Sequence, residues 1–249
     1  MHTDGASPTF GRFSHEMYNA LFGIEFVDDL LRKQRFFEDD LETLRGVFKR
    51  HLIADYFGIC LLHNHNTLRG GEAMVQTRQR HPHYGDALTT SPRRATGRIF
   101  GQAVPWSFRA CRGSEGYVLC PIEFSTDPLV HEANNLLVSK PAFAEEFCEH
   151  VFVLGLSDYV GLALLRRDFP APPLGWRAVE AISAGRENIV HYAPDSGQRL
   201  IQTIYFMGDE DSETRLACPP GCVPRSGCYP TSVGHEIRQR HERIHTITA

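Results

Sequence analysis

The amino-acid sequence predicts an α+β fold in one compact domain, and three observations support this prediction. Apolar residues recur at helical spacing in two separate segments, 37–52 and 141–154. Several other segments are short apolar runs bounded by glycine or proline, which is typical of strands. Hydrophobic residues make up 42% of the chain and charged residues 22%, an ordinary balance for 249 residues that bury a core.

The composition divides the chain into three parts. Residues 1–13 are polar and carry glycine and proline, which indicates a flexible tail. Residues 14–208 hold the helical and strand patterns and form the predicted α+β domain. Residues 209–249 are rich in cysteine, proline, histidine and arginine, and we expect a C-terminal segment of different structure.

The domain begins with helical patterns. Residues 14–37 mix apolar and charged side chains at helical spacing, and Ser14 is a residue type suited to cap the start of a helix. The next segment has a clear apolar face and acidic residues at its start, which favour a helix N-terminus. This face consists of Phe37, Leu41, Leu44, Phe48 and Leu52.

Strand patterns follow. Residues 55–65 form an aromatic and aliphatic run that predicts a strand, and 72–78 are expected to return beside it as a hairpin after a turn at 69–71. Residues 79–98 are largely polar, so we predict a long loop or a mobile surface element there.

The remaining elements repeat the same alternation. A second hairpin is predicted from 104–111 and 117–125, and a helix from 141–154. Further strands are expected at 159–165, 176–183, 188–192 and 200–207.

One strand pattern occurs twice. Asp-Tyr-Phe-Gly-Ile-Cys-Leu-Leu at 55–62 is echoed by Asp-Tyr-Val-Gly-Leu-Ala-Leu-Leu at 158–165. Each copy follows an amphipathic helix and precedes further strands, so we predict a tandem pair of helix-then-antiparallel-sheet units at about 37–125 and 141–207. Chance similarity between short apolar strands is the alternative. Only the first copy continues into histidines, which would place function on the first unit.

These histidines form the main candidate site. Alternation along a strand places His63 and His65 on one face, and Glu72 across the predicted hairpin could add a carboxylate. Two imidazoles and a carboxylate suit zinc, or non-haem iron with open coordination positions. We therefore predict a catalytic metal site at these three residues. In the alternative, both histidines end a strand and form local hydrogen bonds.

The pattern resembles the first motif of the cupin family, Gly-x5-His-x-His followed after three or four residues by Glu. Here four residues separate Gly58 from His63, and six separate His65 from Glu72. The segment Pro-x2-His-x3-Asn at 128–135 is similar to the second cupin motif and lacks its glycine. The resemblance implies a metal ligand at His131, whereas the strong helices are not needed in a cupin.

The same run also resembles a pattern found in a family of uncharacterised fungal proteins. In that family an aromatic-Gly-x2-Leu-Leu-His-x-His segment precedes a Gly-Glu pair, and cysteines and histidines recur near the C-terminus. Here the segment is 56–65 and the pair is Gly71-Glu72. The resemblance implies a shared site at His63, His65 and Glu72 and brings no established activity.

The C-terminal segment contains a second set of potential metal ligands. Its cysteines and histidines satisfy a permissive zinc spacing. The positions that would form the apolar core of a zinc finger hold Ser226 and Ser232, so a nucleic-acid-reading finger is not expected. A loose structural zinc site remains as one prediction, and a Pro/Gly-rich tail with scattered thiols as the other. The predicted ligands are Cys218, Cys222, Cys228 and His235.

Composition also excludes several classes of partner. The net charge of −4 provides no basic field for nucleic acid. No apolar stretch reaches the roughly 18 residues that cross a bilayer. The N-terminus has no apolar secretory core and the seven cysteines are odd in number, so we expect mostly reduced thiols or metal ligands, and a cytoplasmic protein.

These observations favour a metal-dependent enzyme, with zinc or iron, acting on a small-molecule ligand at His63, His65 and Glu72. The alternative is a noncatalytic binding or scaffold protein with a zinc-stabilised C-terminal segment. A third hypothesis is a metal-free enzyme that uses His63 as acid or base, because imidazole titrates near neutral pH.

Overall fold

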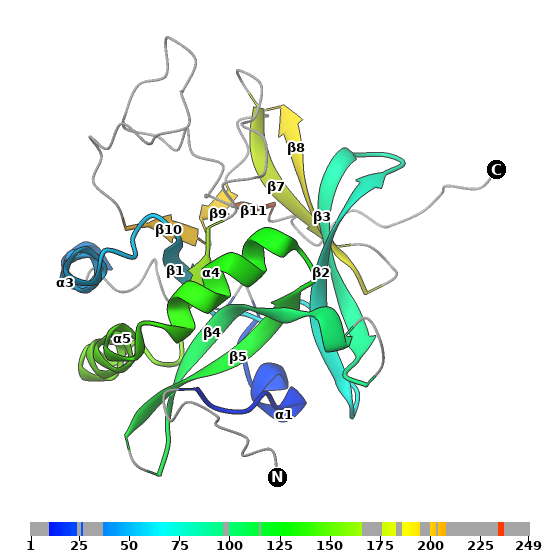
Figure 1. Cartoon of the computed structure of the whole chain (residues 1–249). Coiled ribbons are helices and arrows are strands. Elements are labelled where there is room, and N and C mark those ends of the chain that lie inside the picture. Colours follow the sequence, from blue (N-terminus) through cyan, green and yellow to red (C-terminus); the bar gives the residue numbers. More distant parts are fainter. Residues whose placement is uncertain are drawn as a thin grey trace.

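The computed structural model confirms the predicted α+β fold (Figure 1). It describes residues 10–23, 26, 37–96, 100–114, 116–165, 176–182, 186–194, 200–202, 204–207 and 234–236. Among these residues, the helices are α1 (His15–Asn19), α3 (Phe37–His51), α4 (Pro128–Val138) and α5 (Pro141–Val153), with a 3-10 turn at Phe100–Gln102. The strands are β1 (Phe57–Leu61), β2 (Glu72–His81), β3 (Gly85–Arg94), β4 (Val104–Arg112), β5 (Tyr117–Ser125), β6 (Val160–Leu164), β7 (Trp176–Ile182), β8 (Asn188–Pro194), β9 (Leu200–Gln202), β10 (Ile204–Phe206) and β11 (Gly234–Glu236).

The strands of the described residues form one 11-stranded sheet in the order β10-β1-β6-β4-β5-β2-β3-β8-β7-β11-β9. The two outermost strands are neighbours along the chain, because β9 ends at Gln202 and β10 begins at Ile204. Consecutive Cα atoms lie about 3.8 Å apart, so the sheet must curl until its two edges meet. Figure 1 shows the strands arranged around a ring, with β9 beside β10. We call this arrangement the closed sheet.

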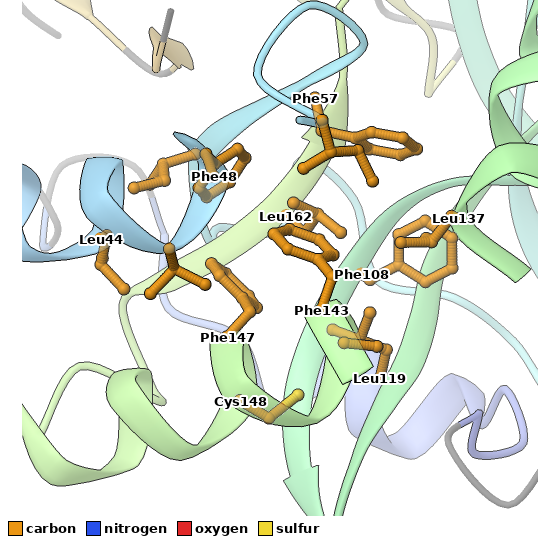
Figure 2. Packing of buried hydrophobic residues seen from close by; sticks show 14 of the residues in the cluster. Leu44, Phe48, Phe57, Phe108, Leu119, Leu137, Phe143, Phe147, Cys148 and Leu162 are labelled. Carbon is orange, nitrogen blue, oxygen red and sulfur yellow. The ribbon is translucent and has the colours of Figure 1, made fainter. Parts of the chain in front are cut away.

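The main core lies on the outer face of the closed sheet, beneath α3 and α5. Phe48 from α3 packs edge-on against Phe143 and Phe147 from α5, with ring centroids 5.1 and 5.8 Å apart. Phe57 and Leu162 meet these rings from β1 and β6 (Figure 2). The aromatic residues whose spacing predicted the two helices are therefore the residues that pack against the sheet.

The inner face carries the alternate residues of the same strands. Cys60 and Ala163 pack there against Tyr18 of α1, whose side chain is fully buried. Ser14 caps α1 as predicted, since its Oγ accepts a hydrogen bond from the Met17 N–H at 3.3 Å. This helix ends at Asn19, and residues 24, 25 and 27–36 of the helical pattern predicted over 14–37 lie outside the described residues.

The loop at 62–71 lies beside α1 at the end of the closed sheet where β1 finishes. The Asn19 side chain holds this loop through two hydrogen bonds to one residue. Its amide donates to the Leu68 carbonyl at 2.9 Å and accepts from the Leu68 N–H at 2.7 Å. The Asn64 side chain donates to the Leu21 carbonyl at 2.6 Å. The loop and α1 therefore form one hydrogen-bonded cover.

The two echoed segments are neighbours in space. β1 and β6 pair antiparallel, and Ile59 lies opposite Leu162, the residue at the equivalent position of the echo. The Leu62 N–H donates to Tyr159 O at 2.8 Å, and the equivalent Leu165 N–H donates to Tyr56 O at the same distance.

The turns before the two strands match as well. The Ile53 N–H donates to Phe48 O, and the equivalent Leu156 N–H donates to Val151 O. The residue before each donor has positive φ, which is 54° at Leu52 and 70° at Gly155. The two segments thus share one local geometry, and their tandem origin stays a prediction.

One predicted hairpin and one predicted loop were wrong. β1 ends at Leu61 and pairs with β6 and β10, not with the segment 72–78. β2 instead pairs with β3 over ten positions and with β5 in parallel, so neither of its edges is open to β1. The predicted loop at 79–98 contains the end of β2 and all of β3, with exposed polar residues near the hairpin tip and buried threonines further along.

Helix α4 was not predicted. Asp127 caps it by accepting from the Leu129 N–H at 3.0 Å, and Pro128 occupies its first turn. The cupin-like segment at 128–135 therefore lies in a helix. His131 Nε2 is hydrogen-bonded to Gln102 O at 2.9 Å, and the cupin-like ligand set is not formed around it.

Both terminal segments contribute to the described structure. The Gly11 N–H donates to Leu119 O at 3.0 Å, so the last residues of the predicted tail 1–13 are attached to β5. Residues 234–236 form β11, which pairs with β7 and β9. Within the part of the chain that the structure describes, no helix is long and apolar enough to cross a membrane.

Candidate functional site

The two predicted site histidines lie together, just beyond the end of β1. The ring centroids of His63 and His65 are 4.4 Å apart with the planes at 73°. His63 Nδ1 is hydrogen-bonded to the Leu61 carbonyl at 2.7 Å, and because a carbonyl only accepts, Nδ1 carries the proton. The lone pair of the neutral ring is then on Nε2. The His65 N–H donates to the Tyr18 hydroxyl at 3.2 Å.

Glu72 is engaged elsewhere. Its carboxylate forms an ion pair with Arg186 at 2.9 Å and accepts from the Arg69 N–H at 2.8 Å. The hydrogen bond from Arg186 holds the pKa of Glu72 below its ordinary value. Among the described residues, no three or more His, Cys, Asp or Glu side chains are arranged to hold a metal ion.

The predicted C-terminal ligands fall largely outside the described residues. This applies to Cys218, Cys222 and Cys228. For His235 the structure describes the backbone, which pairs with Ile201 and Glu180 in β11. The predicted zinc site in this segment stays a prediction.

A second group of polar side chains, which sequence reasoning missed, crosses the inner face in a straight row. Ser125, Gln76, Thr90 and Asn188 are successive pairing partners in β5, β2, β3 and β8. Paired positions point to the same face of a sheet. All four side chains are buried, with at most 4% exposed. We call them the inner polar row.

Glu123 lies next to this row, two positions before Ser125 in β5. It is 6% exposed and pairs with Met74 on one side and with Ser107 on the other. Burial, followed by the nearby Glu123 charge, raises the pKa of the Cys60 thiol to about 12. Cys60 is therefore a protonated thiol at neutral pH and a poor nucleophile.

Two buried donors near these residues have no hydrogen-bond partner within the described parts of the chain. They are Asn188 Nδ2 and Trp106 Nε1. Trp106 sits at a β-bulge in β4, next to Ser107, and packs against the inner cluster around Cys60. Buried polar atoms are nearly always satisfied, and bulges commonly re-aim a side chain near a site.

The histidine loop and the inner polar row are connected. The Asn66 amide donates to Asn188 Oδ1 at 3.5 Å and to Arg186 O at 3.2 Å. Arg186 holds φ at 62°, a conformation that costs energy for a residue with a side chain. Its guanidinium also binds the Thr67 carbonyl, so one arginine ties the loop to the start of β8.

The inner polar row could not be read from the sequence because its members come from four strands. Thr90 lay in a predicted loop, and Gln76 was expected to pair with another strand. The available signal was the run Thr89-Thr90-Ser91, since β-branched residues favour strands.

No protein-family model matches the chain, and comparisons with curated proteins and with solved structures give no match either. The resemblance to a fungal family therefore stays a prediction.

Proposed function

We propose that the protein binds a small polar molecule on the inner face of the closed sheet, at the inner polar row and Glu123. The observation that carries the proposal is the alignment of four buried polar side chains on four adjacent strands. A buried polar group costs about 1–3 kcal/mol when its hydrogen bonds are not made, and among the described residues Asn188 Nδ2 is such a group in this row. Apolar residues at the same positions would fill the face without that cost.

The chemistry of the row indicates what kind of molecule it would take. Asn188 Nδ2 offers a buried donor, which suits a carbonyl, hydroxyl or carboxylate oxygen. The Glu123 carboxylate accepts hydrogen bonds, which suits an N–H or O–H group of the same molecule. A ligand with oxygen acceptors at one end and a hydrogen-bond donor or a cation at the other would bind to both Asn188 and Glu123.

Adjacent threonines on β3 provide a matched test. Thr90 belongs to the inner polar row, whereas Thr89 is equally buried, lies on the other face and accepts from the Gln79 amide at 2.8 Å. The protein is screened by thermal shift against sugars, amino acids, carboxylic acids and amides. We expect at least one class to raise Tm, Thr90→Val to weaken its binding tenfold or more, and Thr89→Val to leave its affinity unchanged.

The proposal fails if no class raises Tm and native mass spectrometry finds no small molecule carried through purification. It also fails if Thr89→Val and Thr90→Val weaken binding equally, because the effect would then reflect general loosening of β3.

The second candidate function is the metal-dependent enzyme predicted from the sequence, with zinc or iron bound by His63 and His65. The proximity of the two imidazole rings supports it. The engagement of Glu72 with Arg186 means that further ligands have to come from other groups or water. An open position on such an ion would polarise a carbonyl or activate water.

Metal analysis tests this candidate, and the chain offers a control. His81 and His83 have the same spacing at the β2–β3 turn, with ring centroids 5.7 Å apart. We expect about one zinc or iron per chain, lost in the double variant His63→Ala, His65→Ala and retained in His81→Ala, His83→Ala. Metal content that is negligible, or equal in both double variants, contradicts the candidate.

A further inference from the structure

Three sulfur atoms from different elements meet at the side of α1. Cys111 in β4 points its Sγ at the Met17 Sδ of α1, and the two sulfurs are 3.7 Å apart. The Cys120 thiol in β5 is on the same face of the β4–β5 hairpin as Cys111. None of these thiols belongs to a disulfide in the described structure. We call Met17, Cys111 and Cys120 the sulfur cluster.

The strand register explains why the two thiols meet. Cys120 lies opposite Arg109, and Cys111 lies opposite Val118, so the two cysteines are diagonal neighbours on one face of the β4–β5 hairpin. Cα atoms in such diagonal positions are about 7–8 Å apart. A disulfide spans about 4.4–6.8 Å. The geometry therefore does not favour a direct bond between the sulfurs.

The segment before α1 encloses the cluster. Phe10 forms a bridge with Leu119, and the Gly11 N–H donates to the Leu119 carbonyl. A Cβ at Gly11 would collide with Cys120 Sγ, so the glycine lets the backbone pass directly against this sulfur. Cys120 is 8% exposed and Cys111 is half-buried, which leaves one side from which an ion could enter.

The 3.7 Å separation of the Met17 and Cys111 sulfurs fits a shared ion. Metal–thiolate bonds are about 2.3 Å long, so two sulfurs in a trigonal arrangement around one ion lie about 4 Å apart. Two thiolates and a thioether are soft ligands, and this set selects Cu(I), whereas the usual zinc ligands do not include a thioether.

We propose that Met17, Cys111 and Cys120 bind one Cu(I) ion. On binding, both thiols release their protons to solvent, and the resulting site carries one net negative charge. Arg109 lies opposite Cys120 on the same face, so its guanidinium, which also forms an ion pair with Asp158, is near that charge.

The test uses the full chain with Cys218, Cys222 and Cys228 changed to serine, so that these thiols do not bind the probe. Cu(I) is added without oxygen in the presence of bicinchoninic acid as competitor. We expect one equivalent to be retained, Cys111→Ser to abolish retention, and Met17→Leu to weaken affinity at least tenfold. X-ray absorption is expected to show three sulfur neighbours, falling to two in Met17→Leu.

A buried thiol outside the cluster is the control. Cys148 in α5 is fully buried in the outer core, and Cys148→Ala is expected to retain the ion. Met17→Leu conserves volume and keeps the test valid if Cys111→Ser does not fold. The proposal is overturned if the background chain retains no Cu(I), if Met17→Leu and Cys111→Ser both bind as the background does, or if the sulfur count is below three.

Discussion

At the scale of single residues, two carboxylates tie distant parts of the chain together. Glu72 holds Arg186 and the loop at 62–71, whereas Glu146 of α5 accepts from His51 at 2.6 Å and from Arg50, both in α3. Hydrogen bonds from these partners hold the pKa of both carboxyls below the ordinary value of 4.5. Both contacts should therefore weaken in acid.

The Glu72 contact predicts a defined pH dependence. A carboxyl with a lowered folded pKa stabilises the fold fully above its unfolded value of 4.5, and the contribution is lost as pH falls through the lower folded value. We expect Glu72→Gln to cost about 0.5–1 kcal/mol at neutral pH, and the difference from wild type to disappear in acid. Urea unfolding over a pH series measures this. The exposed Glu145 provides a control, and a Glu72→Gln deficit that persists at low pH would contradict the assignment.

The matched turns at Leu52 and Gly155 predict opposite effects of two substitutions. Both residues have positive φ after a helix, and a non-glycine residue in this conformation costs about 1–2 kcal/mol. Leu52 is 83% exposed and loses little packing when truncated. We expect Leu52→Gly to raise stability by about 0.5–1 kcal/mol and Gly155→Ala to lower it by about 1 kcal/mol. If thermal unfolding shows that both substitutions change the stability in the same direction, the two turns do not share one geometry.

At the scale of elements, helices and strands with a strong local pattern were predictable, and partners in the sheet were not. The helical spacing at 37–52 and 141–154 gives α3 and α5 almost to the residue, and the hairpin at 104–111 and 117–125 is confirmed. β3 was missed because its buried threonines look polar in the sequence, although the interior accepts them.

The candidate site was predictable to a smaller extent. His63 and His65 do lie together, which local spacing determines even though the strand ends before them. The position of Glu72 depends on which strand lies beside β2, and the inner polar row depends on the order of four strands. Such long-range pairing leaves no periodic signal in the sequence, so the partner of Glu72 and the row had to come from the structure.

The central strand pair predicts a sharp intolerance at one glycine. A Cβ added at Gly161 in β6 would lie 2.5 Å from the Leu62 side chain and would also meet the Phe108 carbonyl. Because that carbonyl belongs to the neighbouring strand, the strands would have to separate. We expect Gly161→Ala to cost about 1–3 kcal/mol in urea unfolding. Gly23→Ala is the control, because no described residue lies within 4 Å of the added Cβ, and similar losses in both variants would contradict this account.

At the scale of the whole molecule, closure of the sheet depends on a short strand late in the chain. β10 covers the edge of β1 through Gly58, Ile59 and Cys60. A chain ending at residue 199 lacks β9 and β10, so we expect it to self-associate through the uncovered edge of β1. Light scattering after size exclusion measures this, and a chain ending at residue 207, which keeps β10, is the control. Identical masses per chain for the two truncations would contradict the prediction.

The same arrangement has a consequence for biosynthesis. A ribosome makes β1 and β6 well before the residues of β10 that complete the ring. Domains generally fold as units during synthesis, and unpaired strand edges promote aggregation in the interval. During synthesis, the apolar strand β1 therefore has one unpaired edge until β10 is made. The translation speed over residues 165–204 determines how long a chaperone has to protect that edge.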